Sequence, residues 1–199
     1  MVYLPLMGCW AMPGGAVMRS IRGIDRRHFL AMTGVTGLTA LAFPAVAARR
    51  VLQPRSLAFQ NLHTGERLKT VYWADGSYLP DALQHINWLL RDFRTDQAHE
   101  MDPRLLDLLA DMHLRLQTTE PFHVISGYRS PQTNAMLAAA SDGVAQNSMH
   151  LQGKAIDIRI PVRSLQHVRA AAISLRQGGV GYYPHSDFVH VDTGRVRYW

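Results

Sequence analysis

Cysteine is almost absent from this sequence of 199 residues, because the one cysteine, Cys9, lies in an N-terminal segment that we expect to be removed. The rest of the chain therefore has no thiol that could act as a nucleophile, form a disulfide or bind zinc. Lysine is also scarce, and the 21 basic residues form no run of five or more. The formal charge of +6 is thus not concentrated in a basic stripe, and we expect no nucleic-acid partner.

Residues 1–47 have the features of an export signal. Arg26 and Arg27 precede a mildly apolar stretch over 31–48 that has no charged residue and ends in an Ala-x-Ala pattern. This combination is typical of the twin-arginine export route, so we expect cleavage after Ala47 and a periplasmic location. The apolar stretch is short beside the roughly 20 residues of a spanning helix, and we expect no stable membrane span after cleavage.

Met18 is an alternative start of the chain, because the residues that follow it form an ordinary basic beginning of a signal. Residues 48–56 are expected to be a linker and 57–199 a single domain, which is an ordinary length for one domain. We expect this domain to be a monomer.

Hydrophobic periodicity predicts the order of the secondary structure. Two apolar-rich segments flank His63-Thr64-Gly65 and predict an N-terminal β-hairpin. Helical spacing and first-turn prolines predict helices over 79–94, from 103 to about 116, over 132–140 and over 164–176. Short apolar segments predict strands at 122–126, 154–160, 179–183 and 188–191. This order predicts an α+β fold in which a small antiparallel sheet packs against helices.

One strand carries a carboxylate among isoleucines. Asp157 alternates with them and follows His150 by seven residues, so it points away from their apolar layer. A buried carboxylate needs a strong partner such as a metal ion or an arginine. Gly153 would let the loop turn back toward Asp157, and His190 lies on a neighbouring predicted strand. Two histidines and one carboxylate suit a catalytic zinc site on the sheet face. On spacing alone, hydrogen-bonded core histidines are the alternative.

The segment 126–199 resembles the D-alanyl-D-alanine peptidase family of zinc metallopeptidases, with the hedgehog/D,D-peptidase fold, and is most similar to its murein endopeptidase K-like branch. The resemblance covers more than a third of the chain. Its matching blocks are Ser126-Gly127-Tyr128-Arg129-Ser130, Ser148-x-His150-x-x-Gly153-x-Ala155-x-Asp157, Gly181-x-Tyr183-Pro184 and Phe188-Val189-His190-Val191-Asp192-x-Gly194.

The resemblance implies that His150, Asp157 and His190 bind Zn²⁺, which activates water for attack on a peptide carbonyl. It implies that Arg129 binds a substrate carbonyl or carboxylate, and a guanidinium there could stabilise the developing oxyanion.

The general base has two candidates. Several family members carry an acidic residue three positions before the last histidine, and here that residue is Asp187. Asp192 is the alternative, because it shares a strand face with His190, where it could take the proton or orient the ligand. The resemblance favours Asp187.

These expectations together indicate a zinc-dependent murein (peptidoglycan) endopeptidase whose partners are murein peptide stems. Two alternatives stay open. A D,D-carboxypeptidase or dipeptidase would act on stem ends and would need a closed pocket with a cation for the free carboxylate. A catalytically inactive wall-binding module would need no zinc.

Overall fold

The computed structural model describes residues 53–140 and 145–199. The predictions for the export signal, the start at Met18 and most of the linker fall outside these residues. Within the part of the chain that is described, no helix combines the length and apolar character required to span a membrane.

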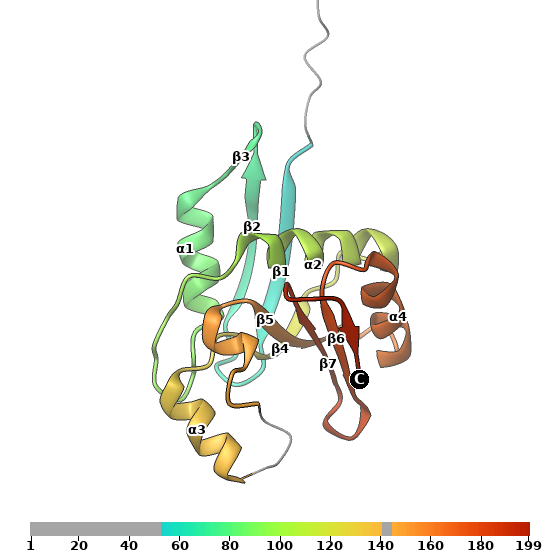
Figure 1. The fold of residues 1–199 in the computed structure, drawn as a ribbon. Helices are drawn as coiled ribbons and strands as arrows, with labels where there is room; N and C mark the ends of the chain where they lie inside the picture. The colour runs from blue at the N-terminus through green and yellow to red at the C-terminus, as the bar shows by residue number, and fades with distance from the viewer. Residues whose placement is uncertain (1–52, 141–144) are drawn as a thin grey trace, which may run out of the picture. The chain divides into compact units, whose positions relative to one another are not determined.

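An eight-stranded sheet, with the strand order β3-β2-β1-β4-β5-β7-β6-β8, organises the described residues (Figure 1). Its pairs are antiparallel except for β1–β4 and β6–β8, which are parallel. The predicted α+β class is confirmed. The strands are β1 (Arg55–Asn61), β2 (Arg67–Ala74), β3 (Ser77–Tyr78), β4 (Phe122–Ser126), β5 (Ala155–Arg159), β6 (Gly179–Tyr183), β7 (Phe188–Asp192) and β8 (Arg197–Tyr198).

Strands β1 and β2 pair in antiparallel register and are joined by residues 62–66. Gly65 takes a φ of 76° in this turn, a left-handed conformation that glycine adopts without a steric penalty. Strand β1 begins at Arg55, inside the stretch predicted as linker, because Arg55 and the next residue already pair with β2.

Four α-helices accompany the sheet in the described residues: α1 (Pro80–Leu89), α2 (Pro103–Leu116), α3 (Pro131–Ala140) and α4 (Leu165–Leu175). The prediction that the first helix runs to 94 was wrong. The backbone N–H of Tyr128 donates to the carbonyl of Leu90, 2.8 Å away, and Asp92 accepts the N–H of Ser130. Residues 90–92 therefore bind the segment over 128–130 instead of continuing the helix.

Helices α1, α2 and α4 share one hydrophobic core with the sheet. Ile156 and Ile158 of β5 and Val189 and Val191 of β7 are fully buried in it. Burial of such a side chain stabilises the fold by about 1.5–3 kcal/mol. Because strand residues alternate in direction, the same strands turn Asp157 and His190 to the opposite face.

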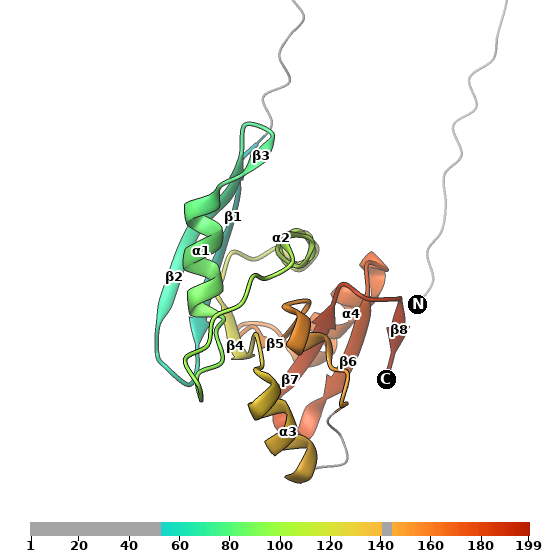
Figure 2. The same ribbon diagram turned by 60° about the vertical axis from the view of Figure 1, so that its left-hand side comes forward.

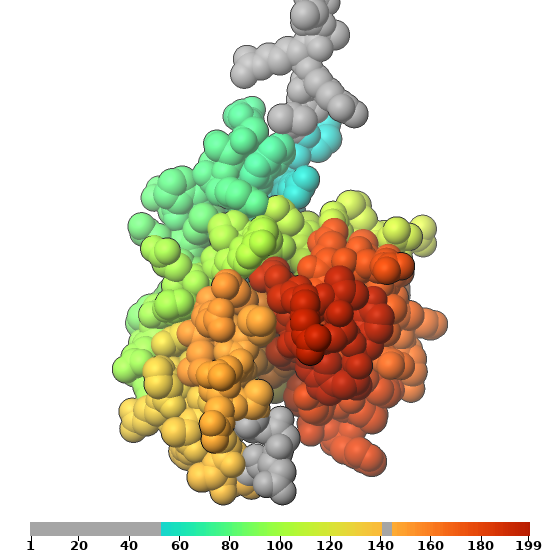
Figure 3. Space-filling model, in the orientation of Figure 1, coloured from blue at the N-terminus to red at the C-terminus, as the bar shows by residue number. Residues whose placement is uncertain are grey.

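Two short 3₁₀ helices, η1 (Met149–Gln152) and η2 (Pro184–Ser186), lie in the connections before β5 and between β6 and β7. Figure 2 shows α3 and the segment around η1 away from α1. In the space-filling view of Figure 3, the orange segment around residue 150 lies beside the red C-terminal strands. The core thus packs against one face of the strands, and the polar side chains of Asp157 and His190 lie on the other face.

Candidate metal-binding active site

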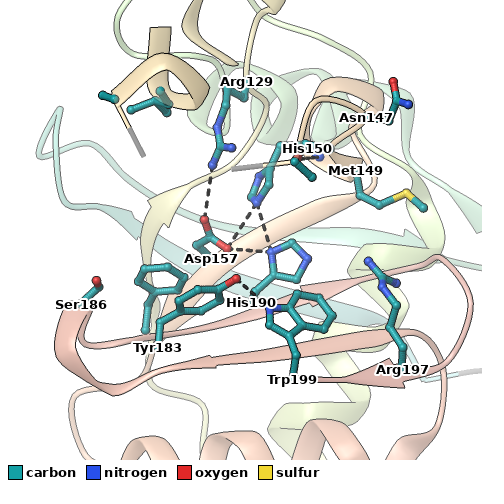
Figure 4. A pocket seen from close by; sticks show the side chains of 15 residues that line it. Arg129, Asn147, Met149, His150, Asp157, Tyr183, Ser186, His190, Arg197 and Trp199 are labelled. Atoms are coloured by element: carbon teal, nitrogen blue, oxygen red, sulfur yellow. Dashed lines mark hydrogen bonds and ion pairs between the residues drawn. The ribbon is translucent and has the colours of Figure 1, made fainter. Parts of the chain in front are cut away.

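Three side chains converge on one point of the sheet face (Figure 4). Nδ1 of His190 lies 2.9 Å from Oδ1 of Asp157. Nε2 of His150 lies 3.2 Å from that Nδ1 and 3.3 Å from the same carboxylate oxygen. All three residues are buried. The structure therefore brings together the three residues for which the sequence predicts metal binding.

The spacing of these three atoms fits a zinc ion. Donors around a tetrahedral zinc with bonds of about 2.0–2.1 Å are separated by roughly 3.3 Å, close to the distances between these atoms. Two imidazole nitrogens that face each other and one carboxylate oxygen also concentrate lone pairs in a buried space, which a cation stabilises. The donor set and its spacing are consequently those of a catalytic zinc site, which keeps one coordination position free of protein.

His150 is held by the loop that precedes β5. Ser148 caps η1, and its Oγ accepts the N–H of His150. Nδ1 of His150 lies 2.6 Å from the carbonyl oxygen of Gly127. Because a carbonyl only accepts, Nδ1 carries the hydrogen and Nε2 is left with its lone pair toward Asp157. The loop closes at Gly153, whose φ is 64°, in agreement with the predicted turn.

His190 is held from its other edge by Asp192. Nε2 of the ring lies 3.0 Å from Oδ2 of this carboxylate, so Nδ1 is the nitrogen available for a metal. Arg197 donates two hydrogen bonds to Asp192, at 3.0 and 2.8 Å. The backbone N–H groups of Gly179 and Gly194 donate to it as well. This carboxylate is fully buried, and both of its oxygens accept hydrogen bonds from protein groups.

The charges at the site are strongly coupled. Burial favours the neutral acid, yet the neighbouring His150 and His190 hold the pKa of Asp157 well below its usual range. Burial likewise disfavours an imidazolium, but hydrogen bonds to Asp157 and Asp192 raise the pKa of His190 to about 9. Hydrogen bonds from His190 and Arg197 also outweigh burial at Asp192 and lower its pKa. Both carboxylates are therefore ionised at neutral pH.

Arg129 lies beside the three converging residues. Its backbone N–H donates to the carbonyl of His150, and its Nη2 lies 3.7 Å from Oδ2 of Asp157. Nη1 contacts Oδ1 of Asn134 at 3.4 Å. Burial lowers the pKa of Arg129, and the nearby Asp157 counteracts this. Its buried Nε has no hydrogen-bond partner among the described residues.

The two candidate bases occupy different places. Asp192 contacts His190 on the edge of the ring that faces away from Asp157. Asp187 follows η2 with a φ of 54°, and its carboxylate pairs with Arg159. The residues on either side of Asp187, Ser186 and Phe188, line the pocket. The structure thus brings Asp192 to His190, while Asp187 lies between two residues that line the pocket.

A pocket of about 650 Å³ opens at His150, Asp157 and His190. One wall holds Trp199, whose indole N–H donates to the hydroxyl of Tyr183 at 2.7 Å and whose ring centroid lies 5.3 Å from that of His190 (Figure 4). Sequence reasoning missed this wall. The glycine at position 181 was the available indication of this wall, because the Cβ of any other residue there would lie 2.7–2.8 Å from atoms of the Trp199 indole.

An α+β fold that presents two histidines and a carboxylate at an open pocket has the donor set of a metal-dependent hydrolase. Residues 49–199 match the family model described as "Peptidoglycan L,D-endopeptidase MepK", and the chain belongs to this family. The family predicted from the sequence blocks is confirmed.

Two relatives illustrate how far the similarity extends. The peptidoglycan L,D-endopeptidase MepK of Escherichia coli (strain K12) is 44% identical over 176 residues, which cover 88% of this chain and 97% of the relative. A protein of Haemophilus influenzae named "Probable peptidoglycan L,D-endopeptidase MepK" is 44% identical over 178 residues, covering 88% of this chain and 95% of the relative. The similarity therefore spans nearly the whole length of both relatives.

Proposed function

We propose that this protein is a zinc-dependent murein endopeptidase that hydrolyses a peptide bond between an L- and a D-centre in the cross-links of the cell wall. One observation carries the proposal: Nε2 of His150, Oδ1 of Asp157 and Nδ1 of His190 lie within 4.8 Å of one another at an open pocket. The names of the relatives support the substrate and the type of bond.

His150, Asp157 and His190 would hold the ion, and the carbonyl of Gly127 and the carboxylate of Asp192 would keep the two imidazoles in the required tautomers. When bound, zinc supplies a Lewis acid that polarises the peptide carbonyl and lowers the pKa of the attacking water toward 7. The chain's own contribution is to hold three donors in place before the substrate arrives.

Arg129 is assigned to the oxygen of the scissile carbonyl. Its guanidinium is largely buried, and its Nη2 is 3.7 Å from Asp157, which is longer than a hydrogen bond. An arginine whose donors are not all engaged can bind an oxygen that becomes negative as the carbonyl is attacked. Asn134 links Arg129 to the carbonyls of residues 145 and 146, which fixes the direction of the side chain.

Asp187 is assigned to the transfer of the proton, and Asp192 to the orientation of His190. Asp192 is surrounded by donors and lies behind the imidazole, where it cannot contact a water on the Nδ1 side. Asp187 is exposed at the rim, next to two residues that line the pocket. This division of roles agrees with the position of Asp187 three residues before His190.

A D,D-carboxypeptidase or dipeptidase is the alternative enzyme. Arg129 and Arg197 both line the pocket and could bind a free carboxylate, so the charge of the pocket suits either activity. The intact set of His150, Asp157 and His190 argues against an inactive wall-binding module, because such a module gains nothing from these buried polar residues.

A periplasmic location after twin-arginine export, and action as a monomer, belong to this proposal. The match to the family begins at residue 49, directly behind the predicted cleavage after Ala47. Export would place the enzyme in the compartment that holds murein.

The activity can be tested on defined cross-linked stem dimers. The purified protein is incubated with zinc and with dimers linked through an L,D bond, dimers linked through a D,D bond, or single stems, and the products are identified by mass. We expect cleavage of the L,D-linked dimer into its two stems. Loss of a terminal residue from single stems, with intact dimers, would favour the carboxypeptidase instead.

A further inference from the structure

A row of polar side chains crosses the metal-binding face of the sheet beyond the metal-binding residues. Arg67 of β2 pairs with Gln60 of β1, Gln60 pairs with His123 of β4, and His123 pairs with Arg159 of β5. Directly paired residues point to the same face of a sheet. Arg159 is two residues after Asp157, so this row lies on the face that carries the metal-binding residues.

We call Arg67, His123 and Arg159 the basic shelf. The residues next to them in the strands, such as Phe122 and Ile158, are fully buried in the core on the other face. The three side chains of the shelf are half-buried or exposed. The shelf ends near Phe188 of β7, which lines the active-site pocket, so a peptide that leaves the pocket on this side would meet Arg159 first.

The positive charge of the shelf comes from its two arginines, Arg67 and Arg159, and His123 adds a polar imidazole between them. The pKa of His123 is lowered by burial and, in addition, by the positive charges of Arg159 and Arg67. Among the described residues, the carboxylate in contact with the Arg159 guanidinium is that of Asp187. The side chains of this ion pair are 36% and 59% exposed. Exposed ion pairs stabilise proteins by only about 0–1 kcal/mol, so another carboxylate can replace Asp187 readily.

We propose that Arg159 binds a free carboxylate of the murein peptide stem, which displaces Asp187 from the guanidinium, and that His123 and Arg67 extend this anion-binding surface. An arginine binds a carboxylate through two parallel hydrogen bonds, which supplies both affinity and orientation. The proposal rests on the proposed function and deepens it.

The test compares Arg159→Gln with the wild type on two matched substrates: an L,D-linked stem dimer with free carboxylates and the same dimer with those carboxylates amidated. Arg55→Gln is the control, because Arg55 forms a similar ion pair with Asp107, with side chains 44% and 27% exposed. Asp107 belongs to α2 on the core side, away from the pocket. Thermal unfolding of both variants shows whether they fold as the wild type does.

We expect Arg159→Gln to lower kcat/KM on the acidic dimer by roughly 10- to 100-fold, the loss typical of a charge-assisted hydrogen-bond pair, and to change it little on the amidated dimer. The wild type should lose a similar factor on amidation, Arg159→Lys should recover part of the activity, and Arg55→Gln should behave as the wild type. An equal loss on both dimers would overturn the proposal, since Arg159 would then only hold Asp187 in place.

Binding of the same two dimers, measured by calorimetry, separates this proposal from the proposed function. If the wild type cleaves neither dimer, the endopeptidase proposal fails, while tighter binding of the acidic dimer that depends on Arg159 would still support the shelf. Equal binding of both dimers by the wild type would contradict the shelf even if cleavage is normal.

Discussion

Oδ2 of Asp192 lies 3.0 Å from Nε2 of His190, while Nδ1 of the same ring lies 2.9 Å from Asp157. The imidazole thus lies between the two carboxylates, and each of its nitrogens contacts a different one. Asp192 fixes the hydrogen on Nε2, and Asp157 and His150 share the side of Nδ1. The carboxylate that orients His190 is thus a different one from the carboxylate that converges with the two imidazoles.

Asp192→Asn should weaken zinc binding by roughly 10- to 100-fold, because the amide no longer fixes the tautomer of His190 as firmly as the carboxylate does. A zinc titration against a competing chelator measures this loss. Turnover at saturating zinc should fall much less. Asp107→Asn serves as a control, since Asp107 accepts hydrogen bonds from Tyr72 and Tyr78 away from the pocket. Wild-type zinc affinity together with lost turnover would instead make Asp192 the base.

Asp187→Asn should show the opposite pattern. The amide cannot accept the proton, so kcat should fall by roughly 100- to 10,000-fold, the usual contribution of a positioned general base. Zinc affinity should stay at the wild-type value, because Asp187 is not among the converging donors. Steady-state kinetics at saturating zinc, with metal content measured on the same sample, decides the matter, and nearly full activity would rule out the assignment.

Gly153→Ala should destabilise the loop that carries His150. The residue has a φ of 64°, and an added Cβ would lie 2.2 Å from the carbonyl oxygen of Glu100. Gly65→Ala is a matched control, because Gly65 has a φ of 76° but nothing within 4 Å of the added Cβ. We expect a loss of about 1–3 kcal/mol in the free energy of unfolding at Gly153, clearly larger than at Gly65. Urea denaturation of zinc-free protein tests this, and equal losses would contradict the steric explanation.

Asp92 predicts a pH dependence of stability. Burial opposes ionisation, but hydrogen bonds from Ser130 and Thr133 lower the pKa of Asp92 below the unfolded value of about 3.9. A lowered folded pKa stabilises the protein above the unfolded pKa, and this stabilisation disappears as the pH falls through the folded pKa. The difference in unfolding free energy between the wild type and Asp92→Asn should therefore be constant from about pH 5 to 7 and shrink below about pH 4. Urea denaturation across this range measures it; a difference that grows toward acid would have the wrong sign.

The sequence predicted the elements that depend on local pattern. Alternation with isoleucines placed Asp157 on the face opposite the core, and the structure has it there. The turn at Gly153 also followed from residue type, and its φ of 64° is that of a left-handed turn. Such features depend on the few residues on either side and are therefore visible in one sequence.

Other features depend on contacts between distant segments. The early end of α1 results from Leu90 and Asp92 bonding to the loop over 127–130. The wall made by Trp199 and Tyr183 requires β8, a strand of two residues that has no periodicity to detect. The shared strand face of Asp192 and His190 was predictable, whereas the ring edge that faces Asp192 was not, because side-chain rotation decides it. No pattern in the sequence indicated that Arg159 and Asp187 meet.

The dependence of murein cleavage on zinc tests the proposed function most directly. Purified murein is incubated with the protein as isolated, after chelation and after zinc is added back, and the released fragments are identified by mass. We expect release of fragments cut at an L,D bond, loss of this release on chelation, recovery with zinc, and no release by His150→Ala. Release that survives complete removal of the metal, or that His150→Ala retains, would contradict it.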